Sequence, residues 1–189
     1  MSIKTRCAWC LSYGDFMSYH DDEWGLPVHD DRHLFEMLVL EGAQAGLNWL
    51  TVLKKRAGYR AAFDNFDAKK IVQYNEEKLA ELAQNPAIIR NKLKIKSAVK
   101  NAKGFIQIQE EFGSFDQFIW QFVDGQPIIN HFKSREEVPA TSKESDAMSK
   151  ALKKRGFSFV GSTICYAYMQ SMGMVNDHTI DCYRWGEVQ

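Results

Sequence analysis

Cysteine and histidine residues near the two ends of the chain have the types and spacing of a metal site. Cys7 and His20 lie near the start, and His178 and Cys182 form a His-x3-Cys pair near the finish. One helical turn would place the second pair on a single face. Two thiolates and two imidazoles complete a tetrahedral zinc site, which is structural because no position is left for water. The spacing therefore predicts a zinc clip that ties both ends to the body of the protein.

The spacing alone leaves alternatives to this assignment open. Free cysteines are usually buried and simply pack. Cys10 competes with Cys7, because Cys7-x2-Cys10 is itself a possible ligand pair. Cys165 stands in the apolar stretch 164–169 and is expected in the core.

A carboxylate in an apolar helical segment is the second feature that could do chemistry. Glu41 follows Leu38-Val39-Leu40, and the first quarter of the chain is rich in aromatic residues: Trp9, Tyr13, Phe16, Tyr19, Trp24 and Trp49. One interpretation is an exposed or capping glutamate, because fully buried glutamate is rare unless paired. The other is a carboxylate in an aromatic cage, where rings stack on a flat base and the carboxylate accepts from its exocyclic amine. The second interpretation predicts a pocket for an extruded nucleobase, especially a positively charged one.

The connection between the last two expected helices has the sequence Arg155-Gly-Phe-Ser-Phe-Val-Gly-Ser-Thr163. Gly156 stands where a helix ends in a left-handed residue, and Gly161 stands just before the next helix. Unpaired N–H groups at the start of that helix, together with its dipole, can bind a phosphate. An ordinary αα-hairpin is the alternative. The basic run 150–155 favours a helix-hairpin-helix contact with the DNA backbone.

Helical spacing of apolar residues runs through almost the whole chain and predicts an all-α protein. A helix capped by Asp30 or Asp31 is expected over 31–43, and Asn48 is expected to cap the next one. Further helices are expected over 67–74, 76–84, 90–111, 115–123, 142–155 and 162–172, with an irregular connection over 125–141. No convincing strand pair is found.

The amino-acid composition limits the classes of protein to which the chain can belong. The chain has 189 residues, of which 45% are hydrophobic and 25% are charged, which suits one compact domain. The formal net charge of zero argues against a protein wrapped all round by nucleic acid but allows a local basic patch. No apolar run could span a membrane, and the start, 1–6, lacks an apolar signal segment. Four cysteines do not suggest a disulfide scaffold, so a cytoplasmic location is expected.

Five ordered blocks of sequence carry a resemblance that covers nearly the whole length. They are Tyr19-His-Asp-Asp-Glu-Trp-Gly25, the segment 40–56 around Glu41 and Trp49, Ile88-Ile-Arg90, the hairpin segment 152–161, and Val175-Asn-Asp-His178. In these blocks the chain resembles the DNA-3-methyladenine glycosylase I family, within the helix-hairpin-helix DNA glycosylase superfamily. The resemblance implies a DNA repair hydrolase that releases 3-methyladenine from alkylated double-stranded DNA and leaves an abasic site.

The resemblance also implies site residues and an organisation. It implies one structural zinc per chain on Cys7, His20, His178 and Cys182, which settles Cys7 over Cys10. The whole chain, 1–189, is then one glycosylase unit, with segments 1–25 and 173–189 joined by zinc and the helix-hairpin-helix at about 143–172. The family's base pocket maps onto Glu41, as the catalytic residue, and Tyr19 and Trp49, with Trp9 and Phe16 as wall residues. DNA contacts are expected from the hairpin region, at Lys153, Lys154, Gly156, Gly161 and Ser162.

Two further expectations concern the reaction. No lysine lies in the hairpin turn or directly after Gly161, where lyase-competent relatives carry a Schiff-base lysine, so a monofunctional glycosylase is expected. A monomer is expected as well. Asp177 is not assigned as a catalytic base; orientation of a metal ligand or a cap is its simplest role. A non-enzymatic DNA-binding module and a small-molecule hydrolase are the rival functions, and detection of released base on methylated DNA separates the first rival from the enzyme.

Overall fold

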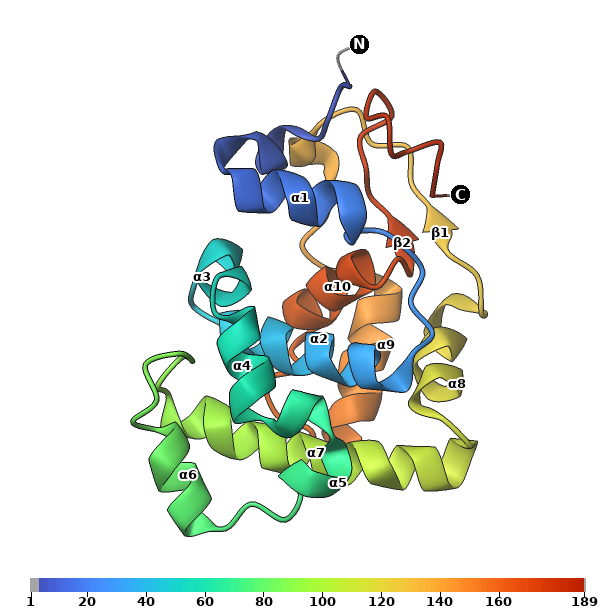
Figure 1. The fold of residues 1–189 in the computed structure, drawn as a ribbon. Coiled ribbons are helices and arrows are strands. Elements are labelled where there is room, and N and C mark those ends of the chain that lie inside the picture. The colour runs from blue at the N-terminus through green and yellow to red at the C-terminus, as the bar shows by residue number, and fades with distance from the viewer. Residues whose placement is uncertain (1–3, 189) are drawn as a thin grey trace.

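The structure, a computed structural model, describes residues 4–188 and consists almost entirely of helices (Figure 1). Residues 1–3 and 189, which belong to the expected single unit, lie outside the described residues. None of the helices in the described part is long and apolar enough to cross a membrane. In chain order the elements are η1 (Ala8–Ser12), α1 (Gly14–Asp22), α2 (Asp31–Gln44), α3 (Trp49–Leu53), α4 (Arg56–Ala62), η2 (Asp64–Phe66), α5 (Ala68–Ile71), α6 (Glu76–Leu82), α7 (Lys92–Phe112), α8 (Phe115–Trp120), η3 (Gln121–Val123), β1 (Ile128–Ile129), η4 (Arg135–Glu137), α9 (Lys143–Lys154), α10 (Ser162–Ser171) and β2 (Val175–Asn176).

Polar side chains start most of the predicted helices, as their sequence positions suggest. Asp30 caps α2 by accepting from His33 N at 2.8 Å, and Asn48 caps α3 by accepting from Thr51 N at 2.9 Å. Asp31, the other candidate cap, instead accepts from the backbone N–H groups of Phe115 and Asp116. Its carboxylate therefore ties the start of α2 to the start of α8.

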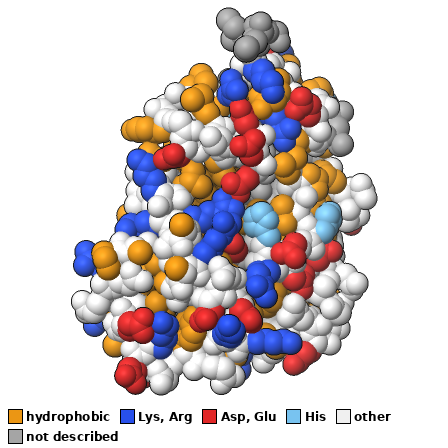
Figure 2. Space-filling model, in the orientation of Figure 1, with side chains coloured by type: hydrophobic (Ala, Val, Ile, Leu, Met, Phe, Trp, Pro, Cys, Tyr) orange, Lys and Arg blue, Asp and Glu red, His pale blue; other side chains and the backbone are white. Residues whose placement is uncertain are grey.

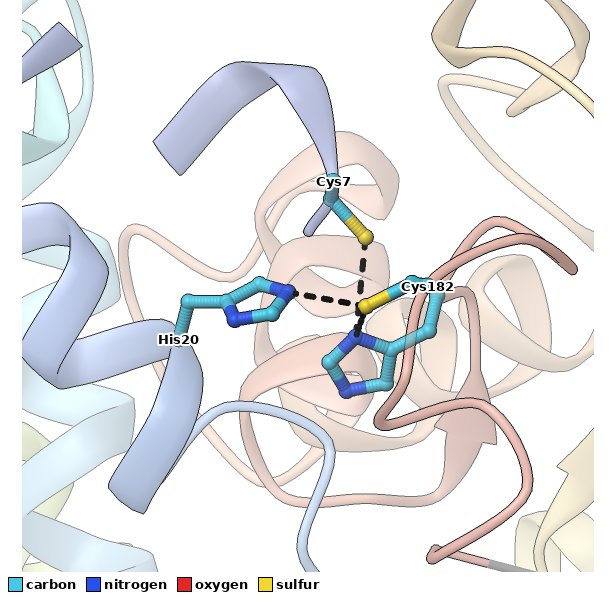
Figure 3. Close-up of side chains that lie close together, drawn as sticks. Cys7, His20 and Cys182 are labelled. Atoms are coloured by element: carbon cyan, nitrogen blue, oxygen red, sulfur yellow. Dashed lines mark hydrogen bonds between the residues drawn. The ribbon is translucent and has the colours of Figure 1, made fainter. Parts of the chain in front are cut away.

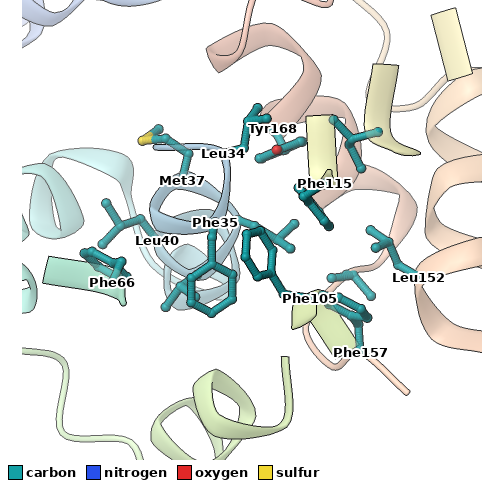
Figure 4. Packing of buried hydrophobic residues seen from close by; sticks show 14 of the residues in the cluster. Leu34, Phe35, Met37, Leu40, Phe66, Phe105, Phe115, Leu152, Phe157 and Tyr168 are labelled. Atoms are coloured by element: carbon teal, nitrogen blue, oxygen red, sulfur yellow. The ribbon is translucent and has the colours of Figure 1, made fainter. Parts of the chain in front are cut away.

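Helix α2 is the centre of the fold. Every residue from Leu34 to Ala43 is buried, and the helix packs against α7, α8 and α10. Aromatic rings fill the space around it: Phe105 lies 4.8 Å from both Phe35 and Phe115, centroid to centroid (Figure 4). A continuous core of this kind is what holds α2 rigid, because large buried side chains contribute about 1.5–3 kcal/mol each.

Several short elements lie outside the predicted set. Among them are the helices η1, α1, α4 and η2; α1 is mostly exposed, so few apolar positions mark it in the sequence. A two-residue parallel ladder, in which Ile128 pairs with Val175 and Ile129 pairs with Asn176, was not predicted either. The expectation of no strand pair is therefore wrong in this detail. Two residues are too few for an alternating pattern to appear, and the all-α class stands.

The charged clusters that are separate in sequence meet in space. Arg56 contacts Glu23 at 2.6 Å and Glu36 at 2.9 Å, and Arg60 contacts Glu36 at 2.8 Å. On the face shown in Figure 2, basic and acidic side chains are interspersed. Part of the basic cluster at 54–56 is therefore neutralised by the acidic segment 15–41.

Candidate functional site

The two ends of the chain meet at a buried group of cysteine and histidine side chains. Cys7, His20, His178 and Cys182 are all buried, and their ligand atoms lie within 4.8 Å of one another. Figure 3 shows Cys7, His20 of α1 and Cys182 of the C-terminal segment converging on one point. The backbone supports the same junction, because Tyr183 N donates to Thr5 O at 3.0 Å.

The spacing of these atoms fits a tetrahedral zinc ion. Cys182 Sγ lies 3.4 Å from His20 Nε2 and 3.7 Å from His178 Nδ1, and Cys7 Sγ lies 3.6 Å from His178 Nδ1. Zinc–sulfur and zinc–nitrogen bonds of ordinary length at tetrahedral angles put sulfur and nitrogen about 3.5 Å apart. The donor set and its spacing therefore suit zinc, with no position open for a water or substrate.

Each imidazole is oriented by its second nitrogen. His20 Nδ1 lies 2.8 Å from Asp21 Oδ1, and His178 Nε2 lies 3.2 Å from Trp24 O. Arg6 in turn donates to both oxygens of Asp21, and this hydrogen bond holds the pKa of the Asp21 carboxyl well below its usual range. Such partners fix the tautomer that a metal needs. Asp21 and Arg6 were not predicted from the sequence; the signal for Asp21 is a carboxylate directly after a candidate histidine ligand.

The local geometry of the C-terminal ligands differs from expectation. His178 and Cys182 lie in bends on either side of a short turn rather than on one turn of helix, with Cys182 N donating to Thr179 O at 2.8 Å. The x3 spacing fits both geometries, so it could not distinguish them. Cys10 is buried and its thiol lies 3.1 Å from Cys7 O, outside the four-residue group. Cys165 is buried in the core as expected.

A cleft of about 970 Å³ opens beside this junction. It brings together all five residues of the expected base pocket, Trp9, Phe16, Tyr19, Glu41 and Trp49. The rings contact one another: the centroid of Trp9 lies 5.8 Å from that of Phe16, and that of Tyr19 lies 5.6 Å from that of Trp49. The cleft is thus walled by aromatic faces contributed by η1, α1 and α3.

Glu41 is a buried carboxyl group in this cleft. Only 4% of it is exposed, so the interpretation as a surface glutamate is wrong. Burial raises its pKa to about 8, and the nearby Ser171 hydroxyl opposes this only in part. The indole N–H of Trp49 is also buried and, among the described residues, has no hydrogen-bond partner. A buried carboxyl group and a buried indole N–H without a partner among the described residues thus belong to two residues that line one aromatic cleft, which is typical of a binding site for a flat polar ring.

Asp177 lines the same cleft but does not orient a metal ligand through its side chain. Its Oδ1 accepts from Asn130 Nδ2 at 2.7 Å, and its Oδ2 accepts from Tyr166 OH and Gln170 Nε2, each at 2.8 Å. The expected role as a ligand-orienting group or cap is therefore wrong. The donors come from α10 and from the connection after β1, which sequence spacing could not bring together.

The hairpin between α9 and α10 has the predicted local geometry. Gly156 adopts a φ of +86°, which favours glycine, whereas Gly161 has an ordinary φ of −63° and open space where a Cβ would lie. The first hydrogen bond of α10 runs from Cys165 N to Gly161 O, so the N–H groups of the first turn lack partners within the helix. Ser162 begins that turn, and its hydroxyl is bonded to Asp146.

The basic residues beside the hairpin divide into free and paired groups. Lys153 and Lys154 are exposed in the last turn of α9, with Lys154 beside a separate hollow next to Phe112. Arg155 instead contacts both carboxylate oxygens of Glu111, at 2.6 and 2.9 Å. The expected lysine contacts are therefore accessible, whereas the neighbouring arginine is neutralised.

Comparison with known proteins matches the chain over nearly its full length. The family model described as methyladenine glycosylase matches residues 9–185. DNA-3-methyladenine glycosylase 1 of Escherichia coli is 48% identical over 177 residues, covering 94% of this chain and 95% of the relative. DNA-3-methyladenine glycosylase of Haemophilus influenzae is 48% identical over 180 residues, covering 95% and 97%.

A solved structure agrees with this assignment. The structure of 3-methyladenine DNA glycosylase I from Staphylococcus aureus, solved to explain 3-methyladenine recognition, superposes with a TM-score of 0.92. It is 31% identical and covers 96% of this chain and 97% of its own. The resemblance found in the sequence is confirmed, and the chain belongs to the methyladenine glycosylase family.

Proposed function

We propose that this protein is a DNA repair enzyme that excises 3-methyladenine from alkylated double-stranded DNA. It hydrolyses the N-glycosidic bond, releases the free base and leaves an abasic site. The observation that carries the proposal is the buried Glu41 carboxyl in the aromatic cleft, which is also lined by Trp49, whose indole N–H has no partner within residues 4–188. Membership of the methyladenine glycosylase family supports the same reaction.

The cleft supplies the contacts that an extruded base needs. Tyr19 and Trp49 offer their faces to the ring, and Trp9 and Phe16 pack behind them. Glu41 accepts hydrogen bonds from the exocyclic amine. Removing the base from the duplex costs stacking and pairing energy, which stacking on aromatic side chains offsets by about 1–3 kcal/mol per base.

The positive charge of the substrate explains why few catalytic groups suffice for the reaction. Adenine methylated at N3 is cationic while joined to the sugar, so the base leaves readily with the electron pair of the glycosidic bond. A water oxygen then forms the new bond to the sugar carbon and loses a proton. In its ionised form Glu41, together with the aromatic faces, favours the cationic nucleotide over neutral adenine, which gains less from a carboxylate and from π-faces.

The hairpin is proposed to hold the DNA backbone. The unpaired N–H groups after Gly161, at Ser162 and its neighbours, bind a phosphate, and Gly156 makes the preceding turn possible. Lys153 and Lys154 add attraction that does not depend on sequence. The protein acts as a monomer in this proposal.

Zinc is proposed as a structural ion, one per chain, held by Cys7, His20, His178 and Cys182. When bound, the zinc ion would cross-link the two ends of the chain and take no part in the chemistry on the substrate. Because Tyr19 precedes ligand His20 on α1, this junction positions one wall of the cleft.

Incubation with methylated duplex DNA tests the proposed function. Chromatography should detect free 3-methyladenine, and alkali-labile abasic sites should appear without strand breaks before alkali treatment, as a monofunctional enzyme requires. Glu41→Gln should release base more slowly. Folded, zinc-containing protein that binds the duplex but releases no base would instead be a binding module.

A further inference from the structure

The turn of the hairpin carries no cation of its own. Residues 156–161 contain neither lysine nor arginine, and Arg155 is occupied by Glu111. A phosphate on the turn therefore needs positive charge from another element. Besides the lysines at the end of α9, helix α7 brings a basic side chain into contact with the turn.

Lys100 of α7 lies directly on this turn. Its ammonium is 3.1 Å from Ser158 Oγ, and its Cε is 3.9 Å from the position that a Cβ on Gly156 would take. The residue is exposed, and no carboxylate within the described residues forms an ion pair with it. An uncompensated ammonium is thus held against the hairpin by a hydroxyl, a partner that an anion can readily replace.

The neighbouring residue fixes the position of Lys100 relative to the turn. The Asn101 amide donates from Nδ2 to Ser158 O at 3.0 Å and accepts from Ser158 N at Oδ1 at 2.9 Å. Asn101 is 3% exposed. A Cβ on Gly104 would lie 2.4 Å from the Phe157 ring, so the two elements are in close contact one turn further along. These contacts prevent α7 from sliding past the hairpin.

The same turn is in contact with the helix that carries Glu41. A Cβ on Gly42 would lie 3.2 Å from Phe159 Cβ and 3.3 Å from Phe159 O. A phosphate bound at the turn is therefore held at a fixed distance from the base cleft. This is the arrangement that a base-extruding protein needs, because one nucleotide must be gripped at both its phosphate and its base.

We propose that Lys100 is a DNA phosphate contact, which completes the hairpin site from α7 and adds a positive charge directly at the turn. The proposal rests on the proposed function only in that the hairpin faces DNA. Lys100 exchanges its bond to Ser158 for a phosphate oxygen when DNA binds. It contributes affinity that is independent of base sequence and sensitive to salt.

The test is the salt dependence of binding to an undamaged duplex, measured for Lys100→Gln, Lys100→Arg and a control. Lys70→Gln is the matched control, because it removes the same charge from an exposed lysine of α5 that lies 3.8 Å from Asp64. For Lys100→Gln the slope of log affinity against log salt should become shallower by about 0.9, the value of one phosphate contact. Its affinity deficit relative to wild type should then shrink about three- to fourfold between about 50 and 200 mM salt.

The other variants distinguish a direct contact of Lys100 with phosphate from a general effect of the protein's positive charge. Lys100→Arg and Lys70→Gln should keep the wild-type slope. An unchanged slope in Lys100→Gln overturns the proposal, and so does an equal change in Lys70→Gln. Lys100→Ala repeats the test if the glutamine variant does not fold. A merely structural role for Lys100 would lower stability without changing the slope.

Two measurements separate this proposal from the proposed function. Free 3-methyladenine should bind Lys100→Gln with wild-type affinity, because the cleft is formed by other segments. Loss of free-base binding would mean that the substitution had disturbed the fold, which overturns a direct contact. If wild-type protein shows the Lys100-dependent slope but releases no base, the phosphate contact stands and the proposed function fails.

Discussion

Glu41→Gln should change the way that stability depends on pH, because the buried carboxyl group resists ionisation. Burial raises its pKa from 4.5 to about 8. A carboxyl whose pKa is raised by folding stabilises the protein fully below pH 4.5, where it is protonated in both states. That stability is lost as pH rises toward 8, because the unfolded chain ionises freely and the folded chain does not.

The size of the effect follows from the shift. One unit of pKa corresponds to about 1.4 kcal/mol. Integrated between pH 5 and pH 8, the loss for Glu41 is about 3 kcal/mol in the free energy of unfolding. Glutamine has nearly the same shape and does not titrate. Over this pH range the free energy of unfolding of the variant should therefore rise by about 3 kcal/mol relative to that of wild type. Any difference between the two proteins that does not depend on pH leaves this change unaffected.

Urea unfolding of both proteins at a series of pH values measures this difference directly. Subtracting the two curves removes the contribution of every other titrating group. Glu76→Gln serves as a control, because it makes the same substitution at a glutamate whose side chain is 83% exposed. A difference between wild type and Glu41→Gln that stays constant from pH 5 to pH 9 would refute the argument that burial keeps the Glu41 carboxyl from ionising.

The same variant tests the pocket. Above pH 8 Glu41 is ionised, and a hydrogen bond from the base amine to this carboxylate is worth about 1.5–3 kcal/mol. Affinity for 3-methyladenine, followed by tryptophan fluorescence with Trp49 as reporter, should fall about ten- to hundredfold in Glu41→Gln. Undamaged duplex should bind as before. Wild-type affinity for the base in a folded variant would place the pocket elsewhere.

Three further predictions concern the other parts of the site. Cys182→Ser should lower the thermal unfolding midpoint and abolish stoichiometric zinc binding, while residual base release persists at low temperature. Metal analysis measures the zinc content, and active wild-type protein without zinc would contradict the prediction. Gly161→Ala should weaken DNA binding with unchanged stability, because a Cβ there would have no neighbour within 4 Å in the described part of the chain. Gly156→Ala should instead destabilise the turn at φ +86°, and equal unfolding midpoints for the two variants would contradict this. Trp49→Ala should cost about 1–3 kcal/mol in 3-methyladenine affinity by calorimetry, and an unchanged value would remove Trp49 from the stack.

Features that depend on neighbours along the chain were predictable from the sequence. Asn48, Asp67 and Ser142 cap helices because a side-chain oxygen reaches N–H groups two or three residues on. Gly156 ends α9 because its positive φ suits glycine. The ligand types of the metal site and the aromatic residues of the cleft were also visible, since their chemistry belongs to the residues themselves.

Features that depend on how distant segments meet were decided only by the tertiary structure. The burial of Glu41 requires α2 to be enclosed by α7, α8 and α10, and sequence alone left an exposed glutamate equally open. The donors to Asp177 come from two separate segments, and Lys100 reaches Ser158 across 58 residues. Periodicity reports which face of a helix is apolar, but not which element covers it or what charge that element brings. Those contacts are set by the packing of the whole core, because the surroundings of each side chain depend on where all the other elements lie.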